Sequence, residues 1–192
     1  MENQNIAINS IQDLINYINK SNITSDNSKK DLAIAIIKQN PEIIKNSEDL
    51  SNFINQLKIT EDYRKKDLAI AIIKQNSDII KSSKALSDFI NELGFEHESS
   101  KRDLAIAIIE NKHDAIKDLT SSTLSAFIKD LGFTDDYCKR DLAIAIIENK
   151  HDIIKDFTSS TLSAFIKDLG FTDDHKKGSL AIAIIENKHD II

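Results

Sequence analysis

A His-Asp pair recurs at one position of the 192-residue chain and is the first candidate for chemistry. It stands at 113–114, 151–152 and 189–190. Imidazole and carboxylate groups bind transition metals, and imidazole also titrates near neutral pH. Equivalent residues of stacked helical copies would, however, lie roughly 8–10 Å apart, too far for two imidazoles to share one ion. We therefore expect surface histidines and no metal site.

An aspartate before each apolar run is the second recurring group. Its copies, with a serine in the last, are Asp31, Asp67, Asp103, Asp141 and Ser179. Two carboxylates about 5–10 Å apart, one of them desolvated, can catalyse hydrolysis. Most of these aspartates follow basic residues, and the last copy lacks the acid. The pattern favours a solvated or salt-bridged helix face over catalysis.

The hydroxyl clusters at 120–123 and 158–161 are the third candidate. A nucleophilic hydroxyl needs an adjacent base that a third group orients, and no histidine recurs in that arrangement. The chain also lacks a glycine-rich phosphate loop, a paired-cysteine motif and H-E-x-x-H. We expect no catalytic residue and no cofactor, and we interpret the hydroxyls as helix caps.

These residues recur because the chain is a series of tandem copies. The five residues of the aspartate row are spaced 36, 36, 38 and 38 positions apart, and such periods are typical of helical arrays. Two segments alternate, an A segment around AIAI and a B segment such as LSAFIKDL. We predict a single array over 1–192. Its parts are a B half-repeat at 1–23, repeats at 24–59, 60–95, 96–133 and 134–171, and an A half-repeat at 172–192.

The B segment has the pattern of an amphipathic helix. Its apolar residues, such as Leu162, Phe165 and Ile166, recur at i, i+3 and i+4. Serine at its start is expected to cap the first turn, and glycine at its end to adopt the left-handed conformation. The serines are Ser47, Ser83, Ser121 and Ser159, and the glycines are Gly94, Gly132 and Gly170.

The A segment is predicted to be a helix with threonine as its N-cap, at Thr60, Thr134 or Thr172, that ends near Asn76 or Lys150. Its run from Leu142 to Ile147 is apolar around the whole circumference, which indicates burial on every side. One two-helix unit cannot bury such a helix, so the copies are expected to stack.

A short linker joins the A and B segments and carries apolar pairs such as Ile43-Ile44. Pro41 disfavours a helical conformation at Asn40, so a short helical turn over about 41–45 is expected. A continuous, bent A helix is the alternative.

The helix pair and its period resemble those of the α-solenoid repeat proteins, close to the tetratricopeptide length. The W-x₂-L-G-x₂-Y signature of that family is absent. The resemblance implies an all-α fold, a right-handed α-solenoid of tandem helical hairpins with a period of 36–38. It transfers no functional residue.

The composition and charge of the chain limit the classes of partner and the cellular compartment that we expect. A net charge of −6 argues against a nucleic-acid surface, and apolar runs of six residues are too short to span a membrane. The amino terminus lacks the features of a signal peptide. Cys138 is alone, and its equivalents in the other copies are polar, which predicts a solvent-facing thiol in a reducing, cytoplasmic setting. Export by a host-associated bacterium is an alternative that no residue favours.

A stacked array presents an extended helical surface, which predicts a non-catalytic protein–protein interaction scaffold. The polar residues of one edge are the expected contacts with a protein or peptide. The alternative is a spacer or a rod that assembles end to end. The chain stops inside a linker, which predicts either a longer array or an end that stacks on another molecule. The expected contact residues are Glu110, Lys112, His113, Glu148, Lys150 and His151.

Overall fold

A computed structural model describes residues 8–76, 78–111, 113–155 and 157–189 of the chain. Over these residues the fold is all-α, with ten α-helices, three short 3-10 helices and no strand. None of the described helices has both the length and the apolar character that crossing a membrane requires. The chain divides into two compact units, residues 1–79 and 80–192.

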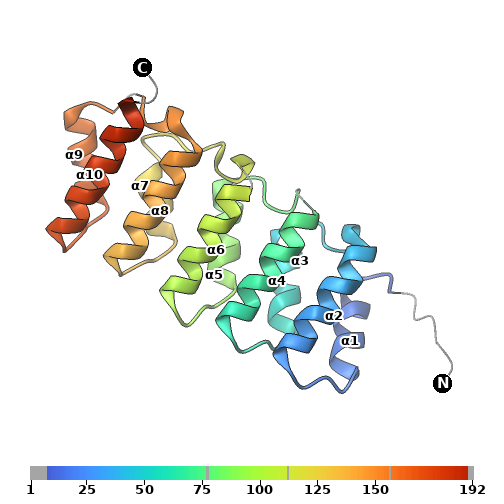
Figure 1. Cartoon of the computed structure of the whole chain (residues 1–192). Helices are drawn as coiled ribbons and strands as arrows, with labels where there is room; N and C mark the ends of the chain where they lie inside the picture. Colours follow the sequence, from blue (N-terminus) through green and yellow to red (C-terminus); the bar gives the residue numbers. More distant parts are fainter. Residues whose placement is uncertain (1–7, 77, 112, 156, 190–192) are drawn as a thin grey trace. The chain divides into compact units, whose positions relative to one another are not determined.

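The first unit contains two A helices and two B helices. The A helices α2 (Asp26–Gln39) and α4 (Asp62–Gln75) pack side by side (Figure 1). The B helices α1 (Ile11–Lys20) and α3 (Ser47–Gln56) pack against them, and η1 (Pro41–Ile43) joins α2 to α3.

The second unit repeats this arrangement. Its A helices α6, α8 and α10 form a row in which α8 packs against both others, and α5, α7 and α9 pack behind it (Figure 1). The helices are α5 (Ser83–Glu92), α6 (Glu98–Asn111), η2 (His113–Ile116), α7 (Leu124–Asp130), α8 (Asp136–Asn149), η3 (His151–Ile154), α9 (Ser159–Asp168) and α10 (Asp174–His189).

The predicted linker turns and the predicted glycine ends of the B helices are confirmed. Short 3-10 turns follow α2, α6 and α8, so the alternative of a continuous, bent A helix is wrong for these copies. The backbone φ is +57° at Gly94, +69° at Gly132 and +63° at Gly170, the left-handed conformation that lets a helix end there.

The predicted N-caps were wrong by one residue or more. The B helices α3, α5 and α9 are capped by Asn46, Ser82 and Thr158, each one position before the predicted serine. The A helices α4 and α8 take Glu61 and Asp135 as N-caps, one residue after the predicted threonine. The threonines make a different contact, described below.

The apolar run of the A helix is not buried on every side, which corrects the prediction. In α8 five of its six residues are buried, but Ile144 is half-buried. The equivalent residues Ile34, Ile70 and Ile106 are also half-buried, and Ile182 is 58% exposed. In α8 the neighbouring A helices α6 and α10 cover two flanks, and the B helix α7 covers a third. The fourth flank therefore faces solvent.

Candidate functional site

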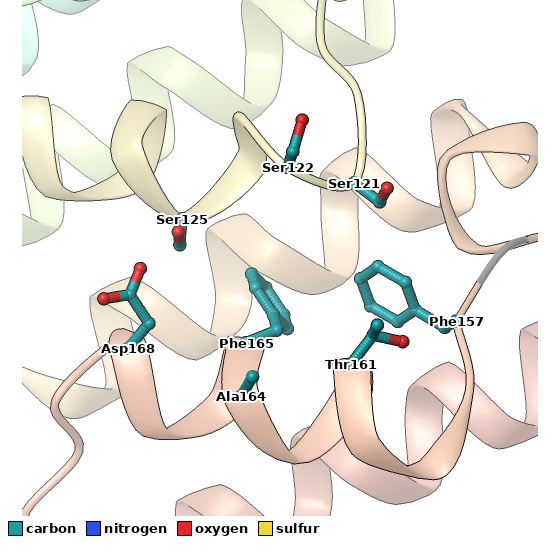
Figure 2. A pocket seen from close by; sticks show the side chains of 8 residues that line it. All are labelled: Ser121, Ser122, Ser125, Phe157, Thr161, Ala164, Phe165 and Asp168. Atoms are coloured by element: carbon teal, nitrogen blue, oxygen red, sulfur yellow. The ribbon is translucent and has the colours of Figure 1, made fainter.

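A hollow of about 310 Å³ lies in the second unit between the segment before α7 and helix α9 (Figure 2). The buried rings of Phe157 and Phe165 form its floor, with centroids 5.5 Å apart. Hydroxyl groups and one carboxylate surround this aromatic floor. The full lining is Ser121, Ser122, Ser125, Phe157, Thr161, Ala164, Phe165 and Asp168.

The hollow lies where two identical sequences fold differently. Residues 121–130 and 159–168 both read SSTLSAFIKD, yet α9 begins at Ser159 whereas α7 begins only at Leu124. In the second copy Thr158 and Thr161 form a capping box. In the first copy residues 121–123 form a turn. Ser121 and Ser122 on that turn line the hollow (Figure 2).

The charged end of the hollow is already neutralised. Hydrogen bonds from the Lys129 ammonium and the Ser125 hydroxyl lower the pKa of Asp168, and Lys129 forms a salt bridge with this carboxylate. An ionised carboxylate held by an ammonium is a poor general acid. An aromatic floor with a hydroxyl rim suits binding of an apolar group that carries a hydrogen-bonding edge.

The residues that were predicted to contact a partner lie in different surroundings in the structure. Glu110 and Glu148 are exposed near the ends of α6 and α8, and His151 is exposed at the start of η3. Lys112 lies outside the described residues. His113 begins η2, and its side chain is outside the described part.

Lys150 connects neighbouring repeats. Its ammonium donates hydrogen bonds to the carbonyls of Ile116 (3.3 Å) and Lys117 (2.6 Å) in the preceding linker. Asn76 has the same place in the first unit and donates to the carbonyl of Ile44 at 2.9 Å. This position therefore holds consecutive linkers together, a structural role that sequence reasoning missed.

Three residues of the aspartate row form ion pairs, which agrees with the predicted salt-bridged helix face. Arg102 contacts Asp103 at 2.7 Å and Asp141 at 3.3 Å, and so joins α6 to α8. Arg140 contacts Asp141 at 2.5 Å. Asp31 pairs with Lys30 and keeps 59% of its side chain exposed.

The threonines before the A helices belong to a contact between repeats. The Asp136 carboxylate at the start of α8 accepts hydrogen bonds from the Thr172 amide (2.7 Å), the Thr172 hydroxyl (2.8 Å) and the Asp173 amide (2.8 Å). We call this the carboxylate–threonine contact. Asp26 with Thr60, and Glu98 with Thr134, repeat it.

These contacts favour ionised carboxylates. Burial of Asp136 raises its pKa, but the hydrogen bonds from Asp173, Thr172 and Lys139 outweigh burial and lower it to about 2. The same balance lowers the pKa of Asp26 and of Glu98. The recurrence of an acid 34 or 36 residues before each threonine was visible in the sequence, but nothing there showed that the two residues meet.

Cys138 is buried, at 3% exposure, so the expected solvent-facing thiol was wrong. Burial raises the pKa of this thiol to about 11, with a smaller contribution from Asp135. The polar residues at the equivalent positions led to the wrong prediction. This position lies in the first turn of an A helix, where the neighbouring repeat covers part of the surface. Lys176, the equivalent residue of α10, is also buried.

In the part of the chain that the structure describes, no three histidine, cysteine or acidic side chains lie together as metal ligands would. Comparison of the chain with protein-family models, with curated proteins and with solved structures finds no match.

Proposed function

We propose that the chain is a non-catalytic scaffold that binds an extended segment of another protein, and that its repeats form a right-handed α-solenoid. The observation that carries the proposal is the hollow between the start of α7 and α9 (Figure 2). Its size suits one large side chain of a partner, and buried aromatic floors are typical of the pockets that hold such anchors.

The polarity of the hollow selects the kind of anchor. Phe157 and Phe165 contact an apolar side chain, and the hydroxyl of Ser121 bonds to its polar edge or to the adjacent backbone. Because Asp168 is paired with Lys129, a cationic anchor gains little. An aromatic residue with a polar edge, such as tyrosine, fits this combination best.

The contacts between repeats support the scaffold role. The carboxylate–threonine contacts and the Lys150 contacts fix consecutive repeats, so the hollow keeps its shape without a ligand. Pre-organised sites bind with a smaller loss of conformational entropy. Exposed residues such as Glu148 and His151 are then candidates for secondary polar contacts with the partner.

The experiment is affinity capture from native cells with the wild-type chain and with Ala164→Arg. Ala164 is exposed on the wall of the hollow, so a long cationic side chain there blocks the hollow without changing the core. The matched control is Ala126→Arg, at the equivalent exposed position of α7 and outside the lining.

We expect a captured protein that the wild type and Ala126→Arg retain and that Ala164→Arg loses. A tyrosine-containing peptide from that protein is then expected to bind the wild type and to weaken roughly tenfold or more with Ala164→Arg. Equal binding by the two arginine variants would refute the hollow as the binding site.

A further inference from the structure

The burial of equivalent residues shows which face of each repeat meets the next one. In α8, Ala143 and Ile147 are fully buried, whereas their equivalents in α10, Ala181 and Ile185, are half-buried and 48% exposed. Helix α10 packs on one side of α8 and has no further A helix beyond it among the described residues. These two positions therefore face the following repeat.

The B helices show the same difference. In α7, Leu124 and Ile128 are buried at 0% and 1%, but their equivalents in α9, Leu162 and Ile166, are half-buried. Beside them lies a second hollow of about 340 Å³, lined by Ser163, Ile166, Lys167, Phe171 and Lys177. We call Leu162, Ile166, Asp174, Lys177, Ala181 and Ile185 the carboxyl-terminal face.

The first unit carries the opposite half of this interface. In α4, Leu68 and Ile72 are fully buried, whereas their equivalents in α2, Leu32 and Ile36, are half-buried. Tyr17 and Ile23 are half-buried too, and their equivalents Phe53 and Ile59 are buried. We call Tyr17, Ile23, Thr24, Leu32 and Ile36 the amino-terminal face.

The polar groups of the two faces also match. Asp174 is the repeat equivalent of Asp136 and Glu98, the acceptors of carboxylate–threonine contacts, but its side chain is 93% exposed and pairs with Lys177 of its own helix. Thr24 is the equivalent of Thr60 and is exposed. The amino-terminal face therefore carries the threonine donor, and the carboxyl-terminal face carries the carboxylate acceptor, of one more carboxylate–threonine contact.

A second polar contact between helices joins a lysine of an A helix to a carbonyl at the end of the following B helix. Lys29 and Lys101 donate to the carbonyls of Leu57 and Leu131 at the end of the next B helix. Lys177 is their equivalent in α10, and the carbonyl of Ser21 stands at the position of Leu57.

We propose that the carboxyl-terminal face of one chain binds the amino-terminal face of a second copy, and that this interface reproduces the contact between consecutive repeats. Leu32 and Ile36 of the second copy pack against Ala181 and Ile185, and Thr24 donates to Asp174. The interface joins two different surfaces, so further copies add at each free end. It uses no residue of the hollow at α7 and α9 and does not depend on the proposed function.

The test is sedimentation velocity of the 192-residue chain over a concentration series up to the millimolar range. The wild type is expected to give species that grow with concentration. Ile185→Lys places a charge in the carboxyl-terminal face, and Thr24→Glu places a carboxylate opposite Asp174. Each variant alone is expected to weaken association at least roughly tenfold. Because both residues are exposed, unchanged thermal unfolding of each variant verifies the fold.

The decisive sample is a mixture of the two variants. Each keeps one intact face, so the mixture is expected to form a one-to-one pair that does not grow further. Glu148→Lys, a lysine substitution at an exposed site outside both faces, is expected to associate like the wild type. A wild type that stays monomeric throughout, or a mixture that stays monomeric, would overturn the proposal.

One further variant sharpens the register. Lys129 pairs with Asp168 across a repeat contact, and at the proposed interface the equivalent pair is Lys167 with Lys20. Lys20→Glu replaces two like charges by an attractive pair and is expected to tighten association severalfold. Weaker association of Lys20→Glu would contradict this register.

Discussion

Helices α8 and α10 have the same sequence from Leu142 to Asn149 and from Leu180 to Asn187, yet they are buried to different degrees. Helix α8 packs between α6 and α10, and Ile147 is fully buried. In α10 the equivalent Ile185 is 48% exposed. The same side chain is thus a core residue in one copy and a surface residue in the other. The difference shows that burial in this chain depends on a neighbouring repeat.

The largest expected difference between the two helices comes from their isoleucines. Ile147→Ala removes a fully buried side chain and is expected to lower the free energy of unfolding by about 2 to 5 kcal/mol. Ile185→Ala, its matched control, is expected to cost less than about 1.5 kcal/mol. Chemical denaturation at low protein concentration measures both. Equal costs would show that α10 is covered in solution as α8 is.

The carboxylates at the start of the two helices give the next largest effect. Asp136→Ala leaves the amides of Thr172 and Asp173 without their acceptor and is expected to cost about 1 to 3 kcal/mol. Asp174→Ala removes an exposed carboxylate and is expected to leave the stability of the dilute chain nearly unchanged. The same denaturation experiment compares the two, and a similar loss in both variants would argue against the carboxylate–threonine contact.

Lowering the pH is expected to remove gradually the contribution of Asp136 to the free energy of unfolding. Its pKa is lowered in the folded chain to about 2 from an ordinary value of 3.8, so its contribution is complete above about pH 4 and is lost as the pH falls toward 2. The stability difference between the wild type and Asp136→Ala is therefore expected to shrink over this range. Denaturation curves at several pH values measure it, and a difference that stays constant down to pH 2 would contradict the lowered pKa.

The smallest effect is expected from two residues of the predicted edge. Lys150→Ala removes hydrogen bonds to two linker carbonyls and is expected to cost about 0.5 to 1.5 kcal/mol. Glu148→Ala, two residues earlier and exposed, is expected to stay within about 0.5 kcal/mol of the wild type. Thermal unfolding of the two variants separates a residue that joins repeats from a residue that is available to a partner. A larger loss of thermal stability in Glu148→Ala than in Lys150→Ala would contradict the assignment of Lys150 as the residue that joins repeats.

The sequence by itself determined the local elements of this protein. The period, the two alternating helices, the short linker turn that begins at Pro41 and the left-handed glycines depend on spacing and backbone preferences within a few residues. The structure has all of them, although the N-caps lie one or two residues from the predicted positions. The salt-bridged aspartate row was also accessible, because an alternation of charges on a helix surface is a local pattern.

Only the tertiary structure decided which surfaces these elements share. The half-buried flank at Ile144, the buried thiol of Cys138 and the pairing of Asp136 with Thr172 all depend on where a neighbouring repeat lies. The hollow is the clearest case, because residues 121–130 and 159–168 are identical and only the second copy is helical from its first residue. Local preferences depend on neighbours along the chain, whereas burial and contacts between repeats depend on residues about one period away. Two identical segments therefore have the same local preferences, and only their different surroundings in the folded chain make their structures differ.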